Sequence, residues 1–235
     1  MRNTLKTFTV FIALLVSSAF VGYAQNFEEG AVAMKRRDYA EALRIWEPLA
    51  EQGNADAQTM LGVMYNYGHG VAQDFKTAVN WFQLAAEQGD ATAQYNLGVM
   101  YNYGHGVAQD FKTAVNWFQL AAEQGAAKAQ YNLGVMYYDG NGVRQDYKTA
   151  RKWFQLAAEQ GDAEAQFNIG LMYIYGQGVK QNTIRAYIWF NQAATNGLEE
   201  GYENRDFIAE RMTPKAIAKA QLMGRKCEEN NFKGC

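Results

Sequence analysis

The chain has 235 residues and a formal charge of −2, from 22 Lys and Arg against 24 Asp and Glu. A protein that binds nucleic acid needs a stripe of basic side chains to displace counterions from phosphates. The one basic run in this sequence is Lys35-Arg36-Arg37. The charge therefore argues against a nucleic acid as the partner.

Residues 1–24 are predicted to be a signal peptide. Arg2 and Lys6 precede the apolar run Phe8–Phe20, and small residues up to Ala24 suit a signal peptidase. We expect cleavage after Ala24, which leaves an exported chain, periplasmic or secreted, with a charge near −4 because two positive charges are lost from −2. The alternative is an uncleaved membrane anchor, but the run is short for a span of roughly 20 residues. No later segment is apolar enough for membrane insertion.

An internal repeat dominates the rest of the chain. Residues 61–89 and 97–125 are the same string, LGVMYNYGHGVAQDFKTAVNWFQLAAEQG, and looser copies occupy 133–161 and 169–197. Repeats at a fixed period predict a solenoid in which each unit packs only against its neighbours. Four 36-residue units are placed at 54–89, 90–125, 126–161 and 162–197.

Each unit is predicted to be an antiparallel helix pair. In the unit 90–125, Asp90 caps a first helix over 91–102 and Asp110 caps a second helix over 111–123. A glycine that recurs in the middle of the first helix predicts a close crossing, where a side chain would hold the partner helix away. These glycines are Gly62, Gly98, Gly134 and Gly170. The aromatic pairs expected in the core are Trp81-Phe82, Trp117-Phe118, Trp153-Phe154 and Trp189-Phe190.

The repeated pattern is A-x-x-x-L-G-x-x-Y-x-x-G-x-G-V-x-x-D-x-x-x-A-x-x-W-F-x-x-A-A-x-x-G. It resembles the Sel-one-like repeat (SLR), a relative of the tetratricopeptide repeat (TPR), over residues 54–197. The resemblance implies an all-α fold, an α/α superhelical solenoid of antiparallel helix pairs that acts as an adaptor for protein complexes. Exported bacterial members of this kind are associated with envelope processes and host-cell contact. Residues 25–53 resemble an incomplete TPR-like capping hairpin, in which Lys35-Arg36-Arg37 replaces the glycine turn.

Residues 198–235 are predicted to be a C-terminal helical cap. A helix is expected over 202–211, and Thr213 begins another helix whose charged face suits an end cap. Cys227 and Cys235 are the two cysteines of the chain, and in an oxidising compartment we expect them to form a structural disulfide. The alternative is a redox or metal-binding pair, which lacks the C-x-x-C spacing and a nearby histidine.

Little in the sequence supports catalysis. Serine occurs only at Ser17 and Ser18, inside the predicted signal peptide, so the mature chain has no serine nucleophile. His69 and His105 occupy the same turn position of adjacent units, and helix packing at about 10 Å would hold them too far apart to share a zinc ion. We therefore predict no catalytic site, no metal site and no cofactor.

The candidate binding surface is the first helix of each unit, because these helices line the inner wall of such a solenoid. Asparagine offers a donor and an acceptor to a peptide backbone, and aromatic side chains supply anchor area. The predicted partner-binding residues are Tyr95, Asn96, Tyr131, Asn132, Phe167, Asn168, Tyr138 and Ile174. The alternative is that these side chains tie each first helix to its neighbouring unit.

The sequence thus predicts an exported, non-enzymatic scaffold or adaptor that binds a peptide or protein on its concave face. One alternative is an enzyme that binds or hydrolyses β-lactams, because exported cysteine-rich SLR proteins of that kind look remotely similar. That likeness is weakened because no cysteine lies inside a repeat here. Another alternative is an inhibitor or immunity partner of an exported toxin.

Overall fold

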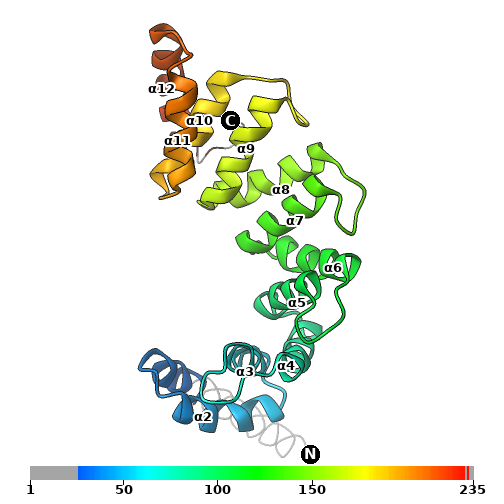
Figure 1. Ribbon diagram of the computed structural model, residues 1–235. Helices are drawn as coiled ribbons and strands as arrows, with labels where there is room; N and C mark the ends of the chain where they lie inside the picture. The colour runs from blue at the N-terminus through cyan, green and yellow to red at the C-terminus, as the bar shows by residue number, and fades with distance from the viewer. Residues whose placement is uncertain (1–25, 231, 233–235) are drawn as a thin grey trace, which may run out of the picture. The chain divides into compact units, whose positions relative to one another are not determined.

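The computed structural model describes residues 26–230 and 232, and every regular element among them is a helix (Figure 1). The chain divides into two compact units. Among the described residues, unit 1 comprises residues 26–100 with Gly104–Ala108, and unit 2 comprises Tyr101–Tyr103 with residues 109–230 and 232. None of the described helices is long and apolar enough to cross a membrane. The predicted signal peptide, residues 1–24, lies outside the described residues, so its cleavage stays a prediction.

Unit 1 begins with a helical hairpin. Residues 26–35 are helical and are followed by α2 (Tyr39–Glu51), and the core between them holds Trp46, whose indole Nε1 donates a hydrogen bond of 3.2 Å to the carbonyl of Phe27. Arg37 takes a φ of 63°, the left-handed conformation that glycine supplies in the later turns. The next helices of the unit are α3 (Ala55–Tyr67), α4 (Phe75–Glu87) and most of α5 (Ala91–Tyr103).

Unit 2 is a row of antiparallel helix pairs followed by two C-terminal helices. Its elements are α6 (Phe111–Glu123), α7 (Ala127–Asp139), α8 (Tyr147–Glu159), α9 (Ala163–Tyr175), α10 (Thr183–Thr195), α11 (Glu199–Ala209) and α12 (Pro214–Glu229). Each of α6 to α9 packs against the helix that follows it, and α10 also packs against α11 and α12. The fold is therefore the all-α solenoid of helix pairs that the sequence predicts.

The helix caps lie where the sequence places them. The Asp90 carboxylate accepts a hydrogen bond of 2.6 Å from the backbone N–H of Ala93, and the Asp110 carboxylate accepts one of 3.0 Å from the N–H of Lys112. The first helix of this repeat ends at Tyr103, one residue beyond the predicted end. At the C-terminal end, α11 begins three residues earlier than predicted, and α12 begins after the cap at Thr213.

The recurring glycines mark close helix crossings, as predicted. At Gly134, in the middle of α7, an added Cβ would lie 2.6 Å from Cδ1 of the Phe154 ring on α8. The same close approach occurs at Gly62 and Gly170, each against the phenylalanine of its own repeat. Real Cβ atoms do not come this close to a buried ring, so only glycine fits at these positions.

The predicted core is wrong for three tryptophans. The phenylalanines Phe82, Phe118, Phe154 and Phe190 are fully buried, but Trp81, Trp117 and Trp153 are only half-buried. Adjacent residues of an α-helix point about 100° apart, so two neighbours cannot both face the partner helix. Trp189 is buried as predicted, since α10 also packs against α11 and α12 and Phe232 lies beside it, with the two ring centroids 5.3 Å apart.

The C-terminal helix ends in a buried contact. Cys227 is buried within α12, and its carbonyl accepts a hydrogen bond of 2.7 Å from the backbone N–H of Phe232. Cys235 lies outside the described residues, so the disulfide between the two cysteines stays a prediction. The basic side chains at Lys215 and Lys219 are exposed, as expected of an end cap.

Candidate protein-binding surface

The first helices of the last two repeats, α7 and α9, carry two aromatic–asparagine pairs. We call Tyr131, Asn132, Phe167 and Asn168 the α7–α9 surface. All four side chains are half-buried. The Tyr131 ring centroid lies 5.8 Å from that of Phe154, and the Phe167 centroid lies 5.4 Å from the phenylalanine of α10. Each aromatic side chain therefore packs partly onto the core of its own repeat.

The two asparagines of the α7–α9 surface are each hydrogen-bonded to their own helix. Asn132 Nδ2 donates to the carbonyl of Lys128 at 2.9 Å, and Asn168 Nδ2 donates to the carbonyl of Glu164 at 2.9 Å. In unit 1, Asn96 donates to the carbonyl one turn earlier at 2.8 Å. These bonds fix the amide in one orientation and use one of its two N–H groups.

Side chains of neighbouring repeats lie close together on this surface. The Asn168 side chain on α9 lies near the hydroxyl of Tyr131 on α7. Burial raises the pKa of Tyr131, nearby Glu164 raises it further, and the amide of Asn168 opposes both effects. This proximity agrees with the alternative interpretation, in which these side chains tie each first helix to its neighbouring unit.

Negative charge gathers at the edge of α9. Glu164 is exposed, and its pKa is raised above the ordinary value, first by partial burial and then by repulsion from Glu200 and Asp162. A carboxyl group whose pKa is raised in this way is stabilised by an approaching cation. The electrostatics therefore favour a polar or basic segment beside Asn168.

The other predicted binding residues lie partly inside the fold. Tyr95 is half-buried on α5, in unit 1. Tyr138 donates a hydrogen bond of 2.7 Å to Oε1 of Gln177 and packs edge-on against Tyr147. Ile174 packs against the hydrophobic core of unit 2. Tyr138 and Ile174 thus make contacts that stabilise the fold. Their role in binding stays a prediction.

A set of buried glutamines was not predicted. In unit 2, Gln130 Nε2 donates to the carbonyl of Ala122 on α6 at 3.1 Å, and Gln130 Oε1 accepts from Nε2 of Gln160 at 2.8 Å. The four equivalent residues are Gln58, Gln94, Gln130 and Gln166, each at most 4% exposed. The sequence signal that could have predicted these buried glutamines is the Ala-Gln pair that recurs in every first helix.

The turn histidines stack on the repeat before them. The His69 ring lies 4.7 Å from the ring of Tyr39 and is nearly parallel to it, and the His105 ring lies 5.0 Å from that of Phe75. In the part of the chain that the structure describes, no group of three or more His, Cys, Asp or Glu side chains could hold a metal ion. The histidines therefore serve as packing residues between repeats.

The comparison with protein families decides the identity of these repeats. The Sel1 repeat profile matches five consecutive segments, at residues 18–54, 55–90, 91–125, 127–162 and 163–198. The chain belongs to the Sel1 repeat family. Sel1 repeats form a scaffold fold for protein interactions, and Sel1 repeat proteins generally bind protein partners. The first Sel1 match includes the N-terminal hairpin and overlaps residues 18–24 of the predicted signal peptide.

Solved structures show the same fold. A protective antigen present in uropathogenic Escherichia coli strains, which displays an SLR fold, is 36% identical with a TM-score of 0.82, over 94% of this chain and 50% of the antigen. A Sel1 repeat protein from Oxalobacter formigenes is 38% identical with a TM-score of 0.69, over 73% of this chain and 70% of that protein.

An immunity protein from Pseudomonas aeruginosa is 20% identical with a TM-score of 0.51, over 77% of this chain and 68% of that protein, and it shares the fold alone. The present Sel1 repeat chain spans about half the length of the Escherichia coli antigen. No curated protein sequence matches it.

Proposed function

We propose that this Sel1 repeat protein is a non-enzymatic adaptor that binds a peptide or protein on the α7–α9 surface. The observation that carries the proposal is the repetition of one aromatic–asparagine pair on adjacent first helices, half-buried and with Asn168 near Tyr131. In a solenoid of this kind the first helices line the concave face, which presents such a row to an extended segment.

The fixed orientation of the asparagines supports a role in recognition. Asn132 and Asn168 are each held by a bond to their own helix, so little side-chain entropy is lost when a partner binds. Their remaining amide N–H and carbonyl oxygen can pair with a peptide backbone. Phe167 and Tyr131 would supply apolar area beside them, and Glu164 favours a basic residue of the partner.

The test is cross-linking in the native cell, with mass spectrometry to identify what is joined to the chain. We expect Asn132→Ala/Asn168→Ala to lose a specific cross-linked protein. The matched control is Asn80→Ala/Asn116→Ala, because these asparagines are exposed on the second helices α4 and α6. If both double variants keep the same cross-linked protein while remaining folded, the α7–α9 surface is not the binding face.

We further propose that the mature protein is exported and works in the envelope or in contact with host cells. The apolar segment after Arg2 and Lys6 supports export. The description of the Escherichia coli relative as a protective antigen supports it as well. N-terminal sequencing of the protein from its native cells should give a start at Gln25, and a start at Met1 would refute the proposal.

A role as the immunity partner of an exported toxin is a second candidate. It is favoured by the fold that this chain shares with the Pseudomonas aeruginosa immunity protein. Identification of a toxin as the cross-linked partner would select it over the adaptor. The β-lactam alternative has a separate test, in which we expect no saturable labelling of the purified protein by a fluorescent penicillin.

A further inference from the structure

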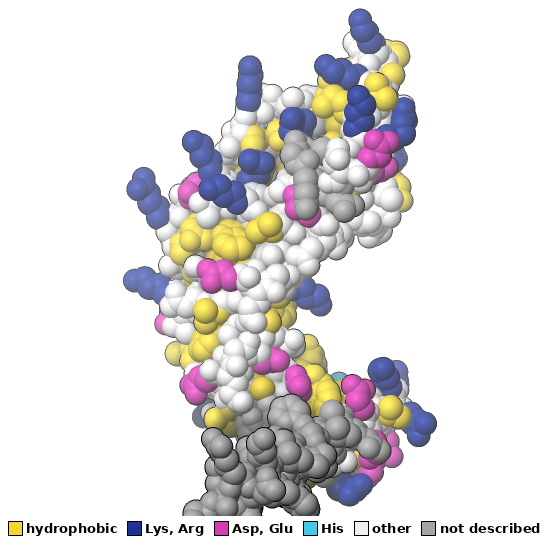
Figure 2. All heavy atoms as spheres, turned by 180° about the vertical axis from the view of Figure 1, so that it is seen from behind, with side chains coloured by type: hydrophobic (Ala, Val, Ile, Leu, Met, Phe, Trp, Pro, Cys, Tyr) yellow, Lys and Arg dark blue, Asp and Glu magenta, His cyan; other side chains and the backbone are white. Residues whose placement is uncertain are grey.

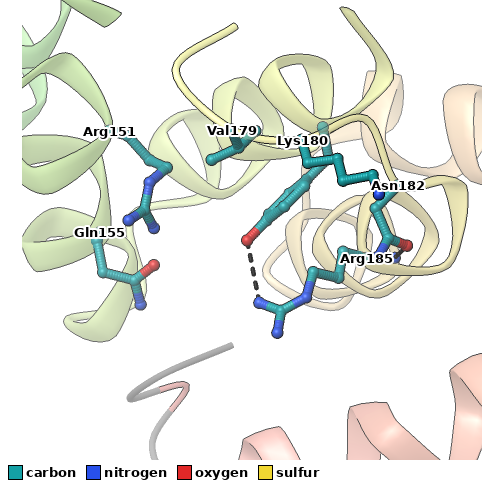
Figure 3. A pocket seen from close by; sticks show the side chains of 7 residues that line it. Arg151, Gln155, Val179, Lys180, Asn182 and Arg185 are labelled. Carbon is teal, nitrogen blue, oxygen red and sulfur yellow. Dashed lines mark hydrogen bonds between the residues drawn. The ribbon is translucent and has the colours of Figure 1, made fainter. Parts of the chain in front are cut away.

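A basic pocket of about 550 Å³ lies in unit 2, between the last two repeats. One wall is formed by Arg151 and Gln155 on α8, and the other by Lys180 in the loop before α10 and Arg185 in the first turn of α10 (Figure 3). Tyr173 of α9 also lines the pocket. A volume of this size suits a few side chains and not a whole domain.

The pocket concentrates positive charge in a chain whose net charge is negative. Three of its lining residues are cationic, and none of the described lining residues is acidic. Arg151 and Lys180 form no ion pair within the described part of the chain. Arg185 is oriented by a hydrogen bond of 3.0 Å from its Nη1 to the hydroxyl of Tyr173. In Figure 2, many of the Lys and Arg side chains likewise lie over unit 2.

Two of these cations are departures from the repeat. The earlier repeats carry Val79 and Val115 at the position of Arg151, and Thr77, Thr113 and Thr149 at that of Arg185. At the position of Lys180 the first two repeats carry Ala72 and Ala108, and the third carries Arg144. The two valines are buried, whereas Arg151 is half-buried and reaches the pocket. Valine and threonine satisfy the fold at the positions of Arg151 and Arg185 in earlier repeats, so the repeat itself does not require these two charges.

One wall of the pocket already binds polypeptide backbone. Gln155 Nε2 donates a hydrogen bond of 2.9 Å to the carbonyl of Phe232, and the Phe232 ring packs on Trp189. The same Nε2 donates a hydrogen bond of 3.1 Å to Oε1 of Glu159, so both N–H groups of this amide are used within the chain. The groups that the site offers to a ligand are therefore its cations.

We infer that this pocket binds the carboxylate side chains of an acidic segment in the partner polypeptide. Guanidinium groups pair with carboxylates through charge-assisted, often bidentate hydrogen bonds, and Lys180 adds a third positive charge. The inference rests on the proposed function, since it assigns the partner a second point of attachment, apart from the α7–α9 surface. The acidic segment binds here while the first helices hold the rest of the partner.

The experiment measures binding of a fluorescein-labelled deca-glutamate peptide to the full chain by fluorescence anisotropy. We expect saturable binding that weakens as salt is added, and no binding of a deca-glutamine peptide of equal length. The double variant Arg151→Val/Arg185→Thr should bind deca-glutamate about tenfold more weakly or worse, because charge-assisted hydrogen bonds are lost. Both substitutions install the residue that an earlier repeat carries, so the helices are expected to form.

The matched control is Lys215→Ala/Lys219→Ala, which removes the same charge from the exposed face of α12. It should bind deca-glutamate like the unmodified chain, and thermal unfolding followed by circular dichroism verifies that both variants are folded. Absence of deca-glutamate binding, or equal binding by both double variants, would overturn the inference.

A second arm replaces the peptide with inorganic phosphate. If phosphate binds in a manner lost in Arg151→Val/Arg185→Thr while deca-glutamate does not bind, the pocket is a phosphate site and the assigned ligand is wrong. If the peptide-binding experiment contradicts the pocket, the cross-linking result for Asn132→Ala/Asn168→Ala still stands. The two proposals can therefore be refuted independently of each other.

Discussion

At the scale of single residues, the second glycine of each turn sets how closely adjacent repeats approach. Gly178 has a φ of 66°, and an added Cβ would lie 2.7 Å from the backbone carbonyl carbon of Tyr147, in the preceding repeat. Gly142 has a φ of 72° and meets the backbone of Phe111 in the same way. These residues combine a left-handed backbone with a contact that no side chain can enter, and both demands exclude other amino acids.

These two demands can be separated by mutation. Gly125 also has a left-handed φ, of 91°, but nothing lies within 4 Å of its added Cβ. We expect Gly125→Ala to lower the free energy of unfolding by about 1–2 kcal/mol, the cost of a left-handed L-residue. Gly142→Ala should cost about 1–3 kcal/mol more, because the preceding repeat must also shift. Urea unfolding measures both values, and equal losses would show that the contact is unimportant.

A second prediction at the scale of residues concerns the stability that the buried glutamines provide. Gln130→Met keeps the length of the side chain but leaves the carbonyl of Ala122 and the amide of Gln160 without this partner. We expect the free energy of unfolding to fall by about 1–3 kcal/mol, the cost of buried polar groups left unpaired. Gln119→Met, at an exposed position of α6, should change it by less than about 0.5 kcal/mol. A loss at Gln130 no larger than that at Gln119 would contradict this role.

At the scale of helices, the N-terminal caps of the second helices carry a dependence on pH. In α8, the Asp146 carboxylate accepts a hydrogen bond of 2.7 Å from the Thr149 hydroxyl and another of 2.9 Å from the N–H of Lys148. The threonine hydroxyl is the main reason that the pKa of Asp146 lies below its ordinary value. The equivalent carboxyl groups Asp74 and Asp110 have lowered pKa values for the same reason.

The sign of the effect follows from the lowered pKa values. The unfolded chain binds protons at these carboxyl groups more readily than the folded chain, so the stability they provide is present above a pH of about 4 and is lost at lower pH. In Asp74→Asn/Asp110→Asn/Asp146→Asn, the caps no longer titrate. We expect the melting temperature of this variant to fall less between pH 5 and pH 2.5 than that of the unmodified chain. Parallel melting curves would contradict the assignment.

Asparagine is a suitable replacement because the fourth repeat already uses it. Asn182 caps α10, and its Oδ1 accepts a hydrogen bond of 3.0 Å from the N–H of Arg185. Helix formation should therefore survive the triple substitution, which circular dichroism at neutral pH verifies.

The helices were predictable because their signals are local and repeated. Aspartate at the cap and glycine in the turn act within a few residues, so Asp90 and Asp110 could be identified as caps from sequence alone. The half-burial of Trp153 was not foreseen, because it depends on which face of α8 its neighbours cover. Trp189, with the same local sequence signal, is buried where α10 packs against α11 and α12 and where Phe232 lies beside it, contacts that come from a distant part of the chain.

The candidate sites were less predictable than the helices. Asn168 and Tyr131 lie near each other on adjacent repeats, and no pattern within one repeat reveals this proximity. The basic pocket likewise depends on Arg151 and Arg185 meeting across the junction of the last two repeats. Departures from the repeat at these two positions were visible in the sequence, but their convergence requires the packing of α8 against α9 and of α9 against α10.

At the scale of the whole molecule, a chain stabilised by contacts between neighbouring repeats should tolerate the loss of one repeat. Deleting residues 62–97 removes one full period of 36 residues and joins Leu61 to Gly98. The sequence after Leu61 is then unchanged over the repeated string, because residues 61–89 and 97–125 are identical. We expect this deletion to leave a cooperative, helical protein with the same ellipticity per residue. The urea m-value should fall in proportion to the surface that is no longer exposed on unfolding.

The control is a deletion out of register. Removing residues 62–79, half a period, joins the start of a first helix to the middle of a second helix. The faces of the fused helix then no longer match those of its neighbours, so cooperative unfolding should be lost and circular dichroism should show less helix per residue. If the full-period deletion disrupts the fold as much as the half-period deletion, stability depends on particular repeats in particular places. Neighbour contacts alone would then be insufficient to hold the solenoid together.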